Sequence, residues 1–356
     1  MKKLIIVIMM GCLLSTAFAQ DSEFYEFNTS RYARTISLAN AFTGLADDIE
    51  TVYYNSAGLA DLDYYAFSYA KGQGFTFIIN NYTADDFALI IPTFNHIGIF
   101  ALSLDRLNFD DAELSDNLYR LHFASPLFTH FSVGASINYY YAHSSPGNLA
   151  VGDEQGDVSG HAFDISLSAL YCIPVTGIPG IIDETRFGFQ LQNVLDTDMH
   201  YSGDLDSHMK HQVLRAGLST IITPELPRVM NLNPVKFLIV ADAVFYGSEY
   251  TFREWQPNFG LELTLLEILK FRYGRENEKQ IKDDYDYSPQ HPVKRYGAGI
   301  TLPLHKWISS FNKIEIAFDY SNSDWDKIDE SNNSFSFWGN EPPIREAYSL
   351  KVYFQY

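Results

Sequence analysis

The sequence contains very little cysteine. Cys12 and Cys172 are the only two in 356 residues, and Cys12 lies in an N-terminal segment that we expect to be removed. The mature chain would then keep one cysteine, which cannot form an intramolecular disulfide. This excludes the class of small exported proteins that disulfides hold together. A chain of this length must be stabilised by a large core or by a membrane.

Long hydrophobic runs are also scarce, and the one at the N-terminus has the form of a secretory signal. Lys2 and Lys3 precede the apolar stretch 4–14, and an Ala-Phe-Ala sequence predicts cleavage after Ala19. The alternatives are an uncleaved membrane anchor, for which the run is short, and a lipoprotein modified at Cys12, which would leave "LLSTAFA" on the mature chain. After residue 19, no stretch is long enough for a transmembrane helix.

Basic residues and catalytic motifs are the remaining shortages. The chain has 25 Lys and Arg against 44 Asp and Glu, a formal charge of −19, which argues against a nucleic-acid partner. It has no Gly-x-Ser-x-Gly elbow, no His-Glu-x-x-His pair and no phosphate loop. His208 and His211, with Asp204 and Asp206, could bind a metal, but we favour a solvated loop. We expect no cofactor, no resident metal and no enzymatic activity; a surface hydrolase whose serine and histidine are distant in sequence remains the alternative.

What the sequence does contain is strict alternation of apolar and polar residues. At the C-terminus, Leu350, Val352 and Phe354 share one face, whereas Ser349 and Lys351 share the other. A period of two is typical of a β-strand. The polar face is often built from Gly, Ser and Ala with scattered charges, which suits a crowded lumen better than an open surface. The apolar face would then contact lipid.

The number and spacing of these strands indicate an all-β fold, a transmembrane antiparallel β-barrel. We expect about fourteen strands, near 64–80, 86–92, 96–104, 116–126, 131–143, 157–172, 185–194, 211–222, 235–247, 254–263, 268–275, 293–303, 313–321 and 346–356. Many of the gaps alternate between long, acidic segments and short turns, as in outer-membrane barrels with both termini in the periplasm. The turns near 173–184 and 223–234 are longer than this rule prefers. We therefore expect a signal at 1–19, an N-terminal segment at 20–63, a barrel at 64–356, and a place in the outer membrane.

Short pieces along the mature chain resemble the PorV/PorQ-type outer-membrane proteins, within the long-chain fatty-acid transporter (FadL-like) barrels. They are "GLADDIETVYYNSAGLA", "GFQLQNV", "VLRAGLS", "ADA", "FGLELTL", "LKFRYG", "GAGITL", "IEIAFDY" and "AYSLKVYFQY", in the order of that group. The resemblance implies a fourteen-stranded barrel with a small N-terminal hatch in the lumen. It also implies one of two roles: passage of hydrophobic molecules, or service to type IX secretion.

The segment 20–63 is the candidate hatch. Residues 38–46 have the pattern of a short amphipathic helix, Asn55 is a good N-cap for the turn that follows through Ala57, and Gly58 allows close backbone approach. Ser56 stands where the resembled group usually has a proline, so we expect a less rigid turn. The segment is either a static plug or a hatch that moves to open a passage.

Polar residues at lumen-facing positions form the second candidate site. They are Arg120, His122, Asp164, Arg215, Asp242, Glu262, Arg272, Glu315, Asp319 and Lys351. We expect opposite charges to lie side by side on adjacent strands, for instance Arg215 with Asp242 and Glu262 with Arg272. A neutralising salt-bridge network is the favoured interpretation, and a polar path for substrate is the alternative.

The function we predict is that of a non-enzymatic, PorV/PorQ-like protein linked to type IX secretion and to surface attachment of exported proteins. The alternative is a FadL-like channel for hydrophobic small molecules. The expected partners are outer-membrane lipid together with secretion-system subunits or exported proteins in the first case, and hydrophobic solutes in the second. Long acidic loops at 276–292 and 322–345 favour the first reading slightly.

Overall fold

The computed structural model describes residues 31–74, 82–92, 98–109, 114–144, 158–174, 183–195, 197, 200–201, 212–248, 251–278, 291–307, 314–323 and 344–355. The expected signal, residues 20–30 and the histidine pair at 208 and 211 lie outside these ranges. Within the described residues, none of the helices has the length and apolar character needed to cross a bilayer.

Fifteen strands make up the described sheet. They are β1 (Tyr64–Gly74), β2 (Tyr82–Pro92), β3 (Ile99–Phe109), β4 (Leu114–Phe128), β5 (Phe131–Ser144), β6 (Val158–Pro174), β7 (Glu184–Gln192), β8 (His200–Tyr201), β9 (Val213–Ile222), β10 (Val235–Ser248), β11 (Thr251–Leu265), β12 (Leu269–Glu278), β13 (His291–Leu302), β14 (Ile314–Ser323) and β15 (Ile344–Gln355). The helical pieces are α2 (Ala33–Ser37), α3 (Thr51–Tyr54), a 3₁₀ turn η1 (Ser56–Asp61) and α4 (Leu304–Trp307).

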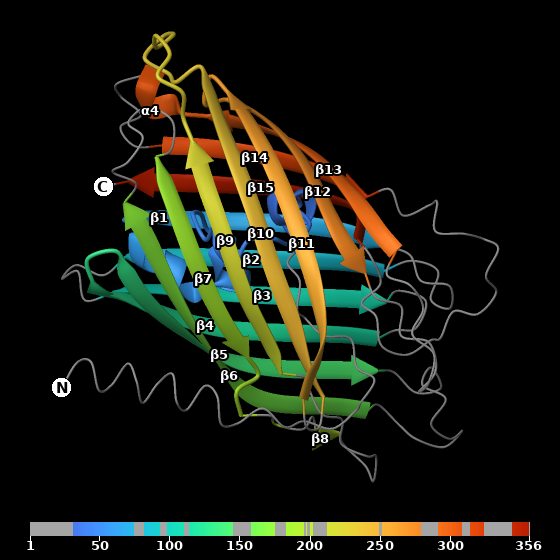
Figure 1. Cartoon of the computed structure of the whole chain (residues 1–356). Coiled ribbons are helices and arrows are strands. Elements are labelled where there is room, and N and C mark those ends of the chain that lie inside the picture. Colours follow the sequence, from blue (N-terminus) through green and yellow to red (C-terminus); the bar gives the residue numbers. More distant parts are fainter. Residues whose placement is uncertain are drawn as a thin grey trace.

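Fourteen of these strands close into an antiparallel barrel (Figure 1). Neighbours in sequence are neighbours in the wall, β1 pairs with β15 as well as β2, and β5 pairs with β6. Closure pairs the backbone N–H and C=O groups at both edges of the fourteen-stranded sheet, which would be costly to leave unpaired in lipid. The predicted strand number is confirmed. The short strand β8 was not predicted; it pairs with β6 at Gly160 and His161, beside the external end of the wall.

The alternation predicted from the sequence sets the two faces of the wall. In β15, Ser349 and Lys351 are buried and face inward, whereas Tyr348 and Phe354 are exposed on the outside. Outward positions elsewhere carry large apolar residues such as Phe163 and Phe318. A closed barrel of even strand number with an apolar exterior is the architecture of outer-membrane proteins. The chain is therefore an outer-membrane β-barrel.

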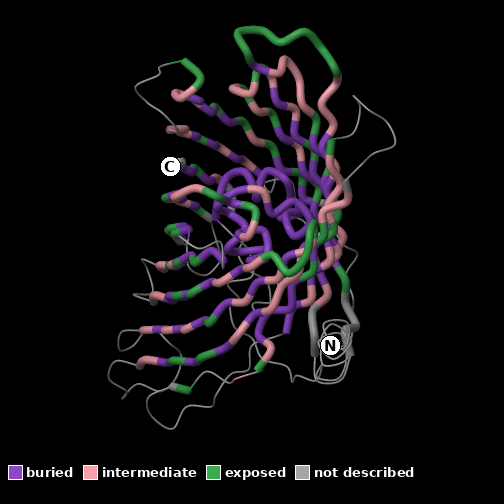
Figure 2. Tube along the Cα trace, turned by 90° about the vertical axis from the view of Figure 1, so that its left-hand side faces the viewer, coloured by how far each residue is buried: buried purple, intermediate pink, exposed green. Residues whose placement is uncertain are grey.

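The first described segment of the chain lies inside this barrel. Figure 2 shows the described segment from residue 31 to the first strand as a buried coil at the centre, surrounded by strands. We call residues 31–63 the hatch. Tyr64 of β1 lies opposite Gln355 of β15, so both ends of the barrel chain are at one rim, where the predicted parity places the periplasm. The hatch thus leads directly into the first strand from the periplasmic side.

Candidate functional site

The hatch is a compact body with its own apolar core. Tyr32, Phe42, Leu45 and Tyr54 are fully buried and belong to one cluster, in which the Phe42 and Tyr54 rings lie 5.8 Å apart. The helix predicted at 38–46 is wrong. Helix α2 ends at Ser37, because Ala39 and Asn40 both adopt positive φ, and the amphipathic pattern instead follows a chain of tight turns. Over so short a segment, apolar residues spaced three or four apart do not distinguish a helix from a series of tight turns.

The turn that begins at Asn55 forms as predicted. The Asn55 side chain accepts the backbone N–H of Ala57 at 3.1 Å, and its amide donates to the carbonyls of Thr43 (2.8 Å) and Ala169 (3.0 Å). One side chain therefore caps η1 and ties it both to the rest of the hatch and to β6. A Cβ at Gly58 would overlap the carbonyl oxygen of Ala46, so this position needs glycine for close approach.

Ser56 and its neighbour bind the wall through a chain of hydroxyl and imidazole groups. Ser56 Oγ lies 2.9 Å from Nδ1 of His122, and Nε2 of His122 lies 3.0 Å from Ser103 Oγ. The Ala57 backbone is held on both sides, since its N–H donates to Ser168 (3.0 Å) and its carbonyl accepts from Ser132 (2.9 Å). The sequence singled out Ser56 and His122 separately. Their contact was not foreseen because nothing in the sequence fixes which wall position meets the turn.

Replacing Ser56 should distinguish the role of its hydroxyl from that of its backbone. Ser56→Ala leaves Nδ1 of the buried His122 without this partner and should weaken hatch docking by about 1–2 kcal/mol. Ser56→Pro loses the same bond, but Ser56 is the first residue of η1, where proline is tolerated, and should recover about 0.5 kcal/mol. Protease cleavage of the hatch over a urea series measures both; a larger loss for proline than for alanine would contradict this assignment.

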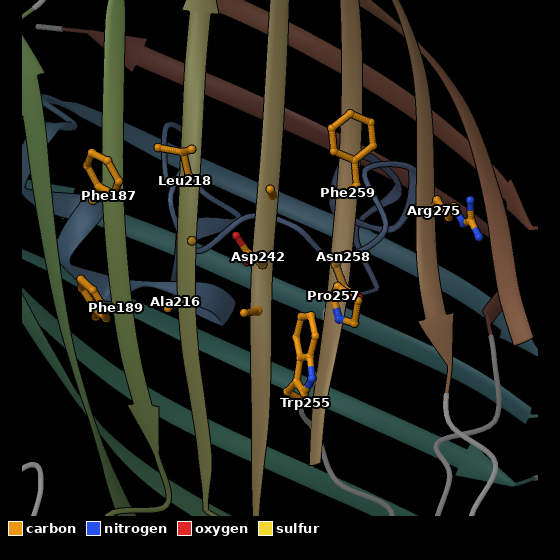
Figure 3. A pocket seen from close by; sticks show the side chains of 13 residues that line it. Phe187, Phe189, Ala216, Leu218, Asp242, Trp255, Pro257, Asn258, Phe259 and Arg275 are labelled. Atoms are coloured by element: carbon orange, nitrogen blue, oxygen red, sulfur yellow. The ribbon is translucent and has the colours of Figure 1, made fainter. Parts of the chain in front are cut away.

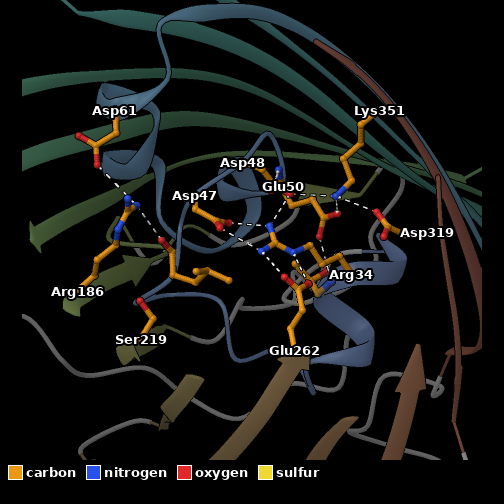
Figure 4. Close-up of polar contacts among 12 residues, drawn as sticks. Arg34, Asp47, Asp48, Glu50, Asp61, Arg186, Ser219, Glu262, Asp319 and Lys351 are labelled. Carbon is orange, nitrogen blue, oxygen red and sulfur yellow. Dashed lines mark hydrogen bonds and ion pairs between the residues drawn. The ribbon is translucent and has the colours of Figure 1, made fainter. Parts of the chain in front are cut away.

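The largest polar contact is an ionic cluster between the hatch and strands β11, β12, β14 and β15 (Figure 4). At its centre, the Arg34 guanidinium lies 2.7 Å from Asp47, 2.8 Å from Asp48 and 3.1 Å from Glu262. The first two carboxylates belong to the hatch and the third to β11. Arg34 therefore folds the hatch and docks it with the same group. We call these residues, with the four in the next paragraph, the docking cluster.

Two wall cations complete the docking cluster. Arg272 lies 2.6 Å from Glu262 and 2.7 Å from Asp319. Lys351 lies 3.0 Å from Asp48 and 3.2 Å from Asp319, and it forms an ion pair with Glu50. Five carboxylates therefore surround three directly paired cations in a region removed from water. Such a cluster stabilises one geometry strongly but tolerates the loss of a partner badly.

Glu50 gives the docking cluster a dependence on pH. The pKa of this fully buried hatch carboxyl is raised to about 7, mainly by burial. The positive charge of Lys351 lowers the pKa, whereas the negative charges of Asp48 and Asp319 raise it. The docked hatch then binds a proton more tightly than the released one, whose Glu50 titrates near its ordinary pKa of 4.5. Docking is therefore strongest below that ordinary value and weakens as pH rises through about 7.

We expect the docked hatch to lose about 2 kcal/mol between about pH 5 and about pH 8 through Glu50. Protease cleavage within 31–63, measured on the folded barrel at several pH values, should follow this trend. Glu50→Gln should flatten it, because the amide mimics the protonated acid without titrating. An unchanged pH profile in Glu50→Gln would assign the effect to another group.

The other predicted lumen residues serve the hatch or the wall in separate places. Asp242 Oδ2 accepts the backbone N–H groups of Phe42 (3.0 Å) and Thr43 (2.8 Å). In the register, Arg215 lies opposite Val244, two residues from Asp242, and its guanidinium lies over the Tyr54 ring at 5.4 Å. The predicted side-by-side placement of Arg215 and Asp242 is thus offset, whereas that of Glu262 and Arg272 is confirmed by both register and distance.

The remaining candidates are scattered around the wall. Arg120 forms an ion pair with Asp105 on β3 and lies over the Tyr53 ring at 4.9 Å. Asp164 accepts the backbone N–H of Leu195 at 3.1 Å, and so holds the segment after β7 against β6. Glu315 is half-buried near the periplasmic end of β14. Among the described residues, no group of three or more His, Cys, Asp or Glu is placed to hold a metal ion.

A small cavity lies between the hatch and the polar part of the wall. It has a volume of about 10 Å³, room for about one water molecule, and is lined by Tyr53, Asn138, Gln190 and Gln192, among others. In this state, the described hatch fills the lumen at its level.

Comparisons with known proteins show similarity to outer-membrane barrels at low identity. A monoaromatic hydrocarbon channel, CymD, is 11% identical over 92% of this chain and 98% of that chain, with a TM-score of 0.49. A FadL homologue of Pseudomonas aeruginosa is 11% identical over 95% and 99%, with a TM-score of 0.45. The KdgM porin is 9% identical over 82% and 99%, with a TM-score of 0.33. No protein-family model and no curated protein sequence matches the chain significantly.

Proposed function

We propose that the protein is a non-enzymatic outer-membrane channel for hydrophobic small molecules, closed by the hatch. This is the second of the two readings offered by the sequence. The observation that carries it is the chemistry of the inner wall around the hatch. Lumen-facing positions of β1 to β4 carry Ala66, Ala88, Ile90, Ala101 and Ala124, all of them 0–2% exposed.

These wall residues belong to the same apolar cluster as the hatch core. On β9 and β10 the cluster continues with Ile221, Leu238 and Val240. A lumen that conducts polar solutes is lined by polar groups. Here the hatch covers an apolar lining, which its displacement would open to a hydrophobic solute.

The way the hatch is attached supports its displacement. Its described contacts with the wall are side-chain ion pairs, hydrogen bonds and apolar packing, and no residue of the segment 31–63 is paired in the sheet. Side-chain contacts can be released without breaking the wall. A pH-sensitive carboxyl in the docking cluster adds a means of weakening them.

The PorV/PorQ-like role in type IX secretion is the second candidate. The observation that favours it is the filled lumen, because a scaffold that grips exported proteins at the surface needs no passage. The acidic loops on which that interpretation depended, 276–292 and 322–345, lie mostly outside the described residues.

Uptake into proteoliposomes tests the channel function directly. The purified barrel should admit an alkylbenzene or a medium-chain fatty acid and exclude a disaccharide of similar mass. In the background of Lys351→Met, which removes a cation that holds the hatch, a charge placed in the apolar lining by Ala101→Asp should slow uptake, and the exterior change Leu102→Asn should not. Equal entry of polar and apolar solutes would disprove the proposal. Exported proteins co-purifying with a barrel that passes neither solute would favour secretion.

A further inference from the structure

The outer face of the barrel carries a groove that the function above does not use. It has a volume of about 540 Å³ and runs over β7, β9, β10 and β11 to β12 (Figure 3). Small outward side chains form its floor: Ala216 lies opposite Ala243, which in turn lies opposite Pro257. Because β-strands of this wall otherwise present bulky apolar groups to lipid, three small residues in one row leave a hollow.

Large aromatic residues form the borders of this groove. Phe187 and Phe189 of β7 stand at one end, and Trp255 and Phe259 of β11 stand toward the other. All four are at least 40% exposed. An apolar trough bounded by aromatic rings has the width and chemistry for a hydrocarbon chain lying against the wall. On this face, the hydrocarbon available is that of the surrounding lipid.

A cation stands at the β12 side of the groove. Arg275 of β12 lies opposite Phe259 and lines the groove, and Lys294 of β13 lies opposite Arg275. Both side chains are exposed on the outer face. Tyr273 and Tyr296, one step further from the external rim on the same strands, form an aromatic pair with centroids 5.7 Å apart. Aromatic residues mark the membrane interface, so the two cations sit at the level of lipid headgroups.

Among the described residues, these two cations have no carboxylate opposite them in the register, unlike cations elsewhere on the outer face. Lys71 and Arg106, on β1 and β3, flank Asp85 in the register. Within the described part of the chain, no carboxylate forms an ion pair with Arg275 or Lys294. Like charges directly opposite each other on neighbouring strands are destabilising, so an anion between them would relieve the repulsion.

We propose that this face binds a phosphate-bearing lipid of the external leaflet. One acyl chain would lie in the groove, over Ala216, Ala243 and Pro257. The phosphate would bind Arg275 and Lys294, whose guanidinium and ammonium groups suit phosphate oxygens. The site is independent of the lumen, so it does not depend on what the barrel transports.

Native mass spectrometry with added lipid tests the proposal on the intact barrel. The probes are a diphosphorylated lipid A and the same lipid with its phosphates removed. The wild type should retain the phosphorylated probe, and Arg275→Gln/Lys294→Gln should bind it at least about tenfold more weakly, as expected for two charge-assisted contacts. Ala243→Phe, which fills the groove and keeps both charges, should weaken both probes.

The matched control is Lys71→Gln/Arg106→Gln. It removes the same amount of positive charge from the outer face of the wall at β1 and β3. It should leave retention unchanged. An equal loss of lipid retention in this control would show that the effect comes from general surface charge. Equal retention of the two probes by the wild type would show that phosphate is not recognised. Either result overturns the site. Heat-modifiable migration of each variant confirms that the barrel is folded.

Discussion

Lys351→Met should release the hatch from an otherwise intact barrel. Lys351 is 1% exposed and contacts Asp48, Glu50 and Asp319, so the substitution keeps most of the volume but removes the cation that compensates three carboxylates. Breaking a buried ionic cluster by removing one partner typically costs about 3–5 kcal/mol. Two of the three carboxylates belong to the hatch, so much of this loss falls on its docking.

Limited trypsin digestion gives the readout, because Arg34 is buried while the hatch is docked and becomes a cleavage site when it leaves. Cleavage should accelerate in Lys351→Met, and hydrophobic uptake should rise with it. Lys71→Met on the neighbouring strand removes a cation from the outer face of β1 and should change neither. Adding Glu50→Gln to Lys351→Met should restore part of the docking, since it removes one of the stranded charges. Equal resistance to trypsin in the wild type, the two single variants and the double variant would contradict the role of the docking cluster.

The wall half of the docking cluster could be predicted from sequence, and the hatch half could not. Glu262, Arg272, Asp319 and Lys351 were all identified because an inward position in a transmembrane strand follows from strict alternation. Because the outer face of each strand contacts lipid, its residues must be apolar, and the alternating polar residues must face the lumen. The barrel's fourteen strands were found for the same reason, with most ends within a few residues of the observed ones.

Arg34, Asp47, Asp48 and Glu50 carry no such signal. The hatch has no repeating period, and its two shortest helices were missed or misplaced because four or five residues cannot establish a period. What positions these side chains is contact with distant strands: Arg34 and Glu262 are 228 residues apart in sequence. Such pairing depends on the closed barrel and is invisible to local pattern. Asn55 and Gly58 were exceptions, because capping and close packing are local requirements that a short motif records.

The glycines of the inner wall define where the hatch can sit, and Gly188 is the strongest case. A Cβ at this position of β7 would overlap the carbonyl group of Thr43 and crowd the Asn55 amide. Thr43 has no room to retreat, because its backbone N–H is bound to Asp242 and Gly44, the next residue, is pressed against Gly217 of β9. Gly188→Val should therefore destabilise docking by about 3 kcal/mol, the upper part of the usual range for overpacking.

The change adds no charge and lies within a paired strand, so the wall itself should persist. The expected result is a folded, heat-modifiable barrel whose hatch is cleaved readily and whose uptake of hydrophobic solute increases. Gly98→Ala is the control: the nearest atoms that a Cβ there would meet belong to Ala124 and Phe123 of the wall, so it should lower barrel stability without opening the lumen. If Gly188→Val instead left the hatch protected and uptake unchanged, the bend at Thr43 would be free to shift, and the hatch would be a plug fitted loosely to its wall. An open channel in Gly188→Val, set against a closed one in Gly98→Ala, would show that the passage is controlled at the hatch surface itself.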